Sequence, residues 1–63
     1  MSNISLLRLP AVMARTGKSR SMIYLEIKKN RFPKPVKISR RSVAWPSDVI
    51  DKYIEDTIKA GGD

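Results

Sequence analysis

The segment ARTGKSRSMIYLEIKKN, from Ala14 to Asn30, contains the tripeptide Gly17-Lys18-Ser19, which allows two incompatible interpretations. Gly-Lys-Ser ends the phosphate-binding loop of nucleotide enzymes, but that loop needs a further glycine where this chain has Val12. The loop also follows a parallel strand of a large sheet, which a chain of 63 residues cannot supply. The sequence therefore argues against a nucleotide-binding site.

The same tripeptide is typical of a tight turn between two helices. Gly17 suits a helix C-terminus, where a residue that tolerates positive φ is favoured. Ser19 can cap the next helix with its hydroxyl, and residues 20–29 contain neither glycine nor proline. Upstream, Pro10 suits the first turn of a helix. The pattern predicts two short helices joined by a tight turn, which is the helix-turn-helix arrangement.

Apolar spacing supports both helices. In the first, Leu9, Val12 and Met13 follow the i, i+3, i+4 spacing of a buried stripe. In the second, Ile23 and Ile27 share one face. The roughly opposite face carries Ser21, Tyr24, Leu25 and Lys28. An outward face with a tyrosine and a leucine indicates more than an ordinary solvated surface.

A β-hairpin is expected after the second helix. The prolines within residues 32–35 prevent a helix there. Residues 36–39 and 43–45 then place large apolar side chains at a period of two, which is typical of strands. Arg40 and Arg41 come at the tip of this hairpin. Because the loop lacks Asn-Gly or Gly-Xaa, we expect a turn of about three to five residues.

Within the hairpin, the alternation directs Val36 and Ile38 inward and Lys37 outward. Trp45 alternates with Val43, so we expect it in the core and not as a platform on which a base stacks. This ribbon would form a wing beside the second helix.

The two flanking segments complete the fold. Residues 5–9 are apolar enough for a brief strand before the first helix. At the other end, Ser47 is the expected cap of a last helix that Gly61 and Gly62 terminate. Its core stripe consists of Ile50, Tyr53, Ile54 and Ile58. The sequence thus predicts one mainly α domain with a small β-hairpin wing, a winged helix-turn-helix spanning 1–63 with its core in about 5–60.

The charge is unevenly distributed. The formal net charge is +7. Residues 1–45 hold eleven of the thirteen Lys and Arg residues and one of the six acids, Glu26, which is +10. Residues 46–63 hold two basic and five acidic residues, which is −3. This asymmetry predicts one face built for a polyanion and another turned away from it.

Several functions are not expected from this composition. The chain has no cysteine and no histidine, which removes disulfides, thiol chemistry and Cys/His zinc sites. We expect no metal and no cofactor, and no enzyme, because the acids of the last helix have no nucleophile or metal partner. No apolar run approaches a membrane span and no signal pattern begins the chain. We expect a protein of the bacterial cytoplasm, associated with the nucleoid.

The predicted contacts with double-stranded DNA come from the second helix and the wing. In helix-turn-helix proteins, the N-terminal residues of the second helix meet the base edges. Arg20 can donate two hydrogen bonds to a guanine or bind a phosphate, and Leu25 can touch a thymine methyl or pack beneath the hairpin. The predicted DNA-binding residues are Ser19, Arg20, Ser21, Tyr24, Lys28, Lys37, Arg40 and Arg41.

Five segments in combination carry a resemblance: LLRLP (6–10), RTGKSRS (15–21), IY (23–24), RFPKPV (31–36) and AWP (44–46). Together the chain, over roughly residues 5 to 58, resembles the AlpA family of small prophage and genomic-island regulators, relatives of the excisionases with a MerR-like winged helix. The resemblance implies a sequence-specific DNA binder that activates an integrase gene or acts directly as an excisionase. It would place the contacts in the Ser19–Lys28 helix and the Arg40–Arg41 wing. Leu25 departs from the polar or basic residue expected at its position.

The choice between activator and excisionase stays open. Excision would require cooperative self-association on DNA and bending, with an integrase or recombinase as partner, whereas activation would require contact with RNA polymerase. A rival interpretation is a protein-interaction module in which the acidic last helix or Leu25 docks a recombinase, with only non-specific attraction to DNA.

Overall fold

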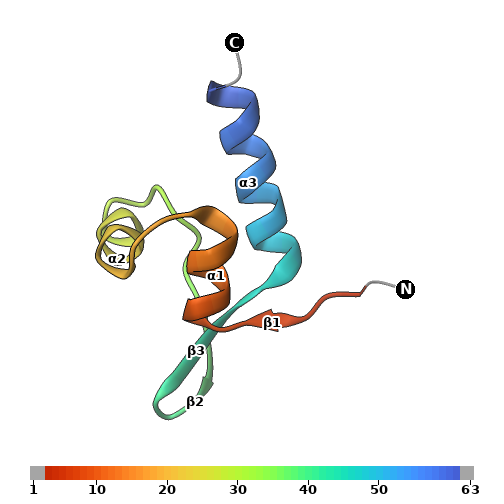
Figure 1. Cartoon of the computed structure of the whole chain (residues 1–63). Coiled ribbons are helices and arrows are strands. Elements are labelled where there is room, and N and C mark those ends of the chain that lie inside the picture. Colours follow the sequence, from red (N-terminus) through yellow and green to blue (C-terminus); the bar gives the residue numbers. More distant parts are fainter. Residues whose placement is uncertain (1–2, 62–63) are drawn as a thin grey trace.

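A computed structural model describes residues 3–61 of the chain. Along the sequence it contains β1 (Leu6–Leu7), α1 (Leu9–Thr16), α2 (Arg20–Lys28), β2 (Val36–Ser39), β3 (Ser42–Pro46) and α3 (Ser47–Gly61) (Figure 1). The predicted class, mainly α with a small β-hairpin, is confirmed, and the order of elements is compatible with a winged helix-turn-helix.

The turn interpretation of the Gly-Lys-Ser tripeptide is confirmed. Gly17 follows α1 in the left-handed region, with φ of 73°, and its N–H donates to the carbonyl of Met13 at 2.9 Å. Ser19 caps α2, because its hydroxyl accepts a hydrogen bond from the N–H of Met22 at 3.2 Å. Val12, where a phosphate-binding loop would need glycine, is buried within α1.

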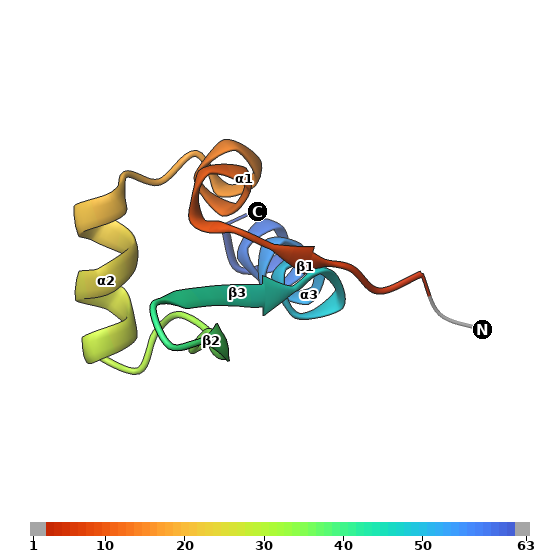
Figure 2. The ribbon, with the colours of Figure 1, turned by 90° about the horizontal axis from the view of Figure 1, so that it is seen from below.

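The strands form one antiparallel sheet in the order β1-β3-β2. The brief strand expected before α1 is present, and it pairs with the far end of the hairpin, with Leu6 opposite Pro46 and Leu7 opposite Trp45. Figure 2 shows β3 between the other two strands. The sheet therefore ties the N-terminal segment to the start of α3.

A small core holds the helices against β3. Its buried side chains are Val12, Ile23, Phe32, Trp45 and Ile50. The half-buried side chains packed on it are Leu7, Leu9, Met13, Ile27, Val43, Tyr53 and Ile54. Trp45 is fully buried, as expected, and its indole N–H donates to the carbonyl of Pro33 at 2.8 Å. This bond fixes the proline-rich link against the sheet.

The expected length of the hairpin turn is wrong. Only Arg40 and Arg41 separate β2 from β3, and Ser39 pairs with Ser42. Among the described residues other than glycine, Asn30 alone has positive φ, so this turn does not need the Asn-Gly of the tightest hairpins. The register shifts between Lys37 and Ser39, and such an irregularity supplies local twist that the turn itself does not.

The expected inward direction of Val36 and Ile38 is also wrong. Every residue of β2 is exposed, including these two. The hairpin extends beyond the body of the molecule, so no helix covers β2 (Figure 1). Alternation alone cannot show where the core ends.

Two expectations for α3 are wrong. Ser47 was expected to cap this helix, but it is the first residue within the helix. Its buried hydroxyl instead accepts a hydrogen bond from the N–H of Ser5 at 2.9 Å, which joins α3 to the N-terminal segment. Ile58 is 64% exposed and lies outside the core, unlike Ile50 and Ile54. The C-terminal half of α3 projects past the other elements, so its stripe has nothing to pack on (Figure 1).

Candidate nucleic-acid interface

Two exposed elements carry the predicted DNA-binding residues. All eight of these residues are exposed: Ser19, Arg20, Ser21, Tyr24 and Lys28 at the start and along α2, and Lys37, Arg40 and Arg41 in the β2–β3 hairpin. We call this hairpin the wing. Exposure is a requirement for contact with DNA, and every predicted residue meets it.

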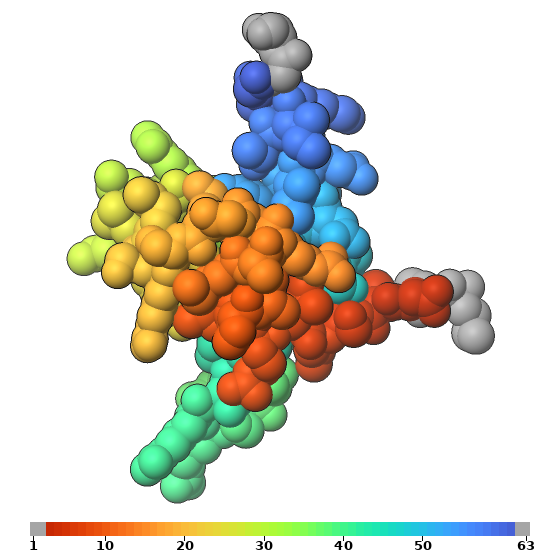
Figure 3. Space-filling model, in the orientation of Figure 1, coloured from red at the N-terminus to blue at the C-terminus, as the bar shows by residue number. Residues whose placement is uncertain are grey.

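The fold places α2 and the wing on the same side. In Figure 2, α2 and the turn of the wing lie at one end of the molecule, and the segment before β1 lies at the other. In Figure 3, the surfaces of α2 (yellow) and the wing (green) flank that of α1 (orange), while α3 (blue) projects away from both. The structure therefore places α2 and the turn of the wing at the same end of the molecule.

Arg20 begins α2 and lies over the ring of Tyr24, with its guanidinium carbon 5.9 Å from the ring centroid. The two residues are one helical turn apart, which is the spacing at which side chains on a helix meet. A cation within about 6 Å of an aromatic face is attracted by the ring. The Tyr24 ring thus attracts the guanidinium of Arg20, for which the sequence predicts a contact with either a guanine or a phosphate.

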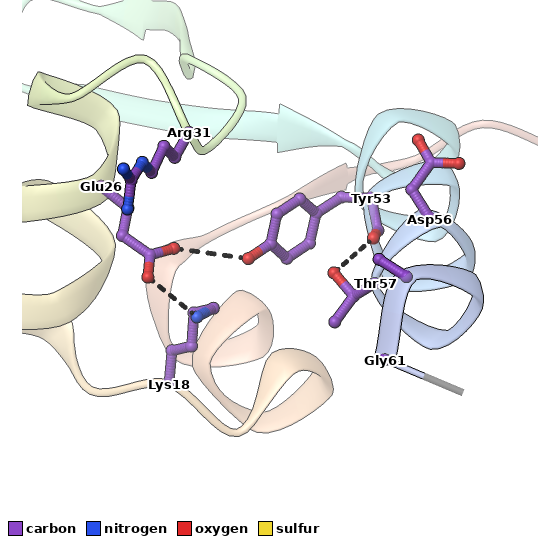
Figure 4. Close-up of a pocket in the computed structure, with 8 residues that line it drawn as sticks. Lys18, Glu26, Arg31, Tyr53, Asp56, Thr57 and Gly61 are labelled. Carbon is purple, nitrogen blue, oxygen red and sulfur yellow. Dashed lines mark hydrogen bonds and ion pairs between the residues drawn. The ribbon is translucent and has the colours of Figure 1, made fainter. Parts of the chain in front are cut away.

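Glu26, the single acidic residue among residues 1–45, is turned away from the exposed face of α2. Glu26 accepts a hydrogen bond from the Lys18 ammonium at 3.1 Å, and a longer one from the Tyr53 hydroxyl at 3.4 Å (Figure 4). The Lys18 and Glu26 side chains are only 25% and 20% exposed. The hydrogen bond to Glu26 raises the pKa of Lys18 above its ordinary value, although partial burial acts in the opposite direction. The outward face of α2 therefore carries only positive charges.

This ion pair was not predicted from the sequence. It lines a pocket between the interhelical turn, α2 and α3, to which Arg31 and Thr57 also contribute. Lys18 and Glu26 are eight residues apart across a turn, and Glu26 and Tyr53 are 27 apart. No local spacing rule joins such residues, so only the fold reveals that they hold α2 to α3.

Other exposed residues beside the predicted set were also missed. Lys29, Arg31 and Lys34 follow α2 and are exposed. Met22 is an exposed apolar residue on α2, and a helical wheel centred on the buried Ile23 would have identified it. Of the two alternatives for Leu25, packing beneath the hairpin does not occur, because its side chain is 45% exposed and does not join the core.

Within residues 3–61, no group of three or more acidic side chains is arranged to hold a metal ion. None of the helices described is both long and apolar enough to span a bilayer.

Comparison with known proteins finds one matching family and two similar proteins, described below. The family described as prophage CP4-57 regulatory protein (AlpA) matches residues 5–58. The DNA-binding transcriptional activator AlpA of Escherichia coli K12 is 38% identical over 64 aligned positions, which cover 92% of this chain and 91% of that protein. An uncharacterized protein of enterobacteria phage P4, ORF88, is 49% identical over 39 residues, which span 62% of this chain and 44% of the phage protein's own length. No solved structure matches significantly.

Proposed function

Since the chain belongs to the AlpA family of prophage regulators, we propose that it is a DNA-binding transcription regulator which acts on prophage or genomic-island DNA. The observation that carries this proposal is the exposed cationic face of α2, with the turn of the cationic wing at the same end of the molecule. The E. coli relative is named as a DNA-binding transcriptional activator, and the match extends over nearly all of both chains.

In the proposed complex, α2 enters the major groove and the wing lies along the flanking backbone. The N-terminus of a recognition helix points at base edges. Ser19, Arg20 and Ser21 lie at the N-terminus of α2. Arg20, restrained by Tyr24, donates two hydrogen bonds to a guanine. Tyr24 and Lys28 reach phosphate oxygens beside the groove. Lys37, Arg40 and Arg41 contact the phosphates that the wing approaches.

The biological outcome of binding is also part of the proposal. The protein activates an integrase gene, or acts as an excisionase that directs recombination toward excision. The first role requires a site beside a promoter and contact with RNA polymerase. The second requires cooperative binding of several copies at adjacent sites, bending of the DNA and contact with an integrase. In either role the protein works by binding alone, as one domain without cofactor or catalysis, on the nucleoid in the bacterial cytoplasm.

The test is a selection of bound duplexes from a random pool, carried out at low and at high salt. We expect one enriched motif that persists at high salt. Motif copies as direct repeats near the integrase gene would support the excisionase role, and a single copy over a promoter would support the activator role. Weak binding that vanishes in salt and enriches no motif would contradict sequence-specific recognition.

A second candidate is a protein-interaction module that docks a recombinase. The specific observation in its favour is that the acidic α3 projects from the body with Ile58 64% exposed. The same selection separates the two candidates, because a docking module would bind the recombinase without enriching any duplex.

A further inference from the structure

The outward face of α2 contains an apolar pair amid positive charge. Met22 is 43% exposed and Leu25 is 45% exposed, and both lie on the helix proposed to enter the groove. They are three residues apart, so their side chains are neighbours on the helix surface. We call Met22 and Leu25 the apolar pair.

Leu25 occupies the centre of that face. An α-helix turns by about 100° per residue, so Leu25 points directly away from the midpoint between Ile23 and Ile27. Ile23 is fully buried and Ile27 packs on the core, so this midpoint defines the inward direction. Among the residues of α2, Leu25 therefore points most directly away from the core, and Met22 lies beside it.

The surroundings of the apolar pair indicate what covers it. Lys28 and Lys29 are exposed beside the pair, and the acid of α2, Glu26, is held by Lys18. A rim of cations around a small apolar centre is complementary to a groove of DNA, where phosphates flank the base edges.

Within the major groove, one base carries an apolar group. The edges of guanine, cytosine and adenine present hydrogen-bond donors and acceptors, whereas thymine adds a C5-methyl group. On the proposed function given above, we infer that Leu25, with Met22 beside it, selects thymine in the bound site by packing against this methyl group. The departure of Leu25 from a polar residue is then a determinant of sequence preference.

The inference is tested by removing the methyl group alone. The duplex enriched by selection is resynthesised with 2′-deoxyuridine in place of thymidine, one position at a time, which preserves every hydrogen bond. Wild-type protein should bind about fourfold more weakly at one or two of these positions, the loss expected for about one methyl group's burial. Binding of each duplex is measured at fixed salt.

Two variants assign the effect to Leu25. Leu25→Ala should bind the thymidine and deoxyuridine duplexes equally at those positions, and its thermal unfolding should match wild type because the residue is exposed. Ile58→Ala removes an even more exposed apolar side chain from α3, and it should keep the wild-type preference for thymidine.

A failure of this inference and a failure of the proposed function would give different results. Equal wild-type affinity for thymidine and deoxyuridine at every position would overturn this inference while leaving DNA binding intact. A loss that persists in Leu25→Ala would also overturn it, because another side chain would then be reading the methyl group. If the selection enriches no duplex, the proposed function fails and the inference fails with it.

Discussion

At the scale of single residues, the stacking of Arg20 on Tyr24 gives Tyr24 two separable roles. Its ring, with the centroid 5.9 Å from the Arg20 guanidinium carbon, attracts this cation, and in the proposed complex its hydroxyl reaches a phosphate. The first role would affect sequence preference, since Arg20 contacts a guanine in the proposed complex, and the second would affect affinity for every sequence. Phenylalanine and leucine separate the roles because only phenylalanine retains a ring.

We expect Tyr24→Phe to weaken binding equally on all duplexes, because it removes the hydroxyl alone. Tyr24→Leu should in addition reduce preference at the guanine read by Arg20, by about 0.5–1 kcal/mol, the value of an exposed cation–π contact. Competition binding on duplexes that differ at that position measures both terms. If the two variants behave identically, the ring does not position Arg20.

Also at the residue scale, Glu26 contributes to the stability of the fold. Its carboxylate joins Lys18 of the turn to Tyr53 of α3, and both partners of the ion pair are mostly covered. Because the pKa of Lys18 is raised in the folded protein, the charged form of this lysine stabilises the fold. The pair therefore matters more to the orientation of α2 than to the charge of the surface.

The stabilisation should depend on pH in a defined direction. A raised folded-state pKa means that the contribution is fully present below the ordinary lysine pKa of about 10.4, and is lost as pH rises through the folded value. We expect Glu26→Gln to lower the free energy of unfolding at pH 7, and this difference from wild type to shrink at strongly alkaline pH. Urea unfolding at both pH values measures it, and a constant difference would contradict the role assigned to the ion pair.

At the scale of elements, α2 depends on its anchors. It has nine residues, and helices of that length are marginal when isolated in water. The Ser19 cap stabilises its N-terminus, Ile23 and Ile27 fix its inner face, and Glu26 fixes its side. These anchors leave the opposite face free, so a surface for recognition follows from how the helix is held.

The wing is an element with a simpler role. Its two-residue turn presents Arg40 and Arg41 next to each other at the end of the ribbon. We expect Arg40→Ala/Arg41→Ala to weaken binding by roughly 1–3 kcal/mol on every duplex, as loss of charge-assisted hydrogen bonds to phosphates predicts. The log–log salt slope should become shallower by about 2, and the preferred sequence should not change. Titrations at several salt concentrations measure both.

The matched control for the wing removes the same charge elsewhere. Lys52→Ala/Lys59→Ala deletes two exposed cations from α3, which projects away from α2 and the wing. This variant should bind nearly as wild type does. Equal losses in the two double variants would mean that only the net charge matters, and that the wing makes no specific contact with DNA.

At the scale of the whole molecule, the fold separates the charges of the chain. Eleven of the thirteen basic residues lie before residue 46, on or next to α1, α2 and the wing, whereas most acids lie on α3 together with Lys52 and Lys59. Where α3 meets α1, Asp51 accepts a hydrogen bond from Arg15 at 2.8 Å. This arrangement orients the molecule toward a polyanion, with α3 on the far side.

Affinity for DNA should therefore fall steeply with salt. With about five to eight phosphates neutralised, we expect a log–log slope of roughly −5 to −7. Binding to a fixed duplex over a series of salt concentrations measures this slope. A flat response would show that α2 and the wing do not lie against the phosphate backbone.

Features that depend on neighbours close in sequence were predicted correctly, whereas several features that depend on packing between elements were not. The Gly17 turn, the Ser19 cap and the buried face of α2 were predicted because each rests on neighbours within about one helical turn. The predictions for Ile38 and Ile58 were wrong for a shared reason. Both residues continue a periodic pattern past the point where another element covers it, and periodicity carries no information on where that cover ends.

By itself, the sequence determined the helices, the turn between them, the presence of a hairpin and the uneven charge, because these depend on local backbone preferences and composition. Only the tertiary structure decided that α2 and the turn of the wing lie at the same end of the molecule and that Glu26 links Lys18 to Tyr53. It also decided that Leu25 stays uncovered. Such contacts join residues distant along the chain, so they arise only when the small core around Trp45 has brought the elements together.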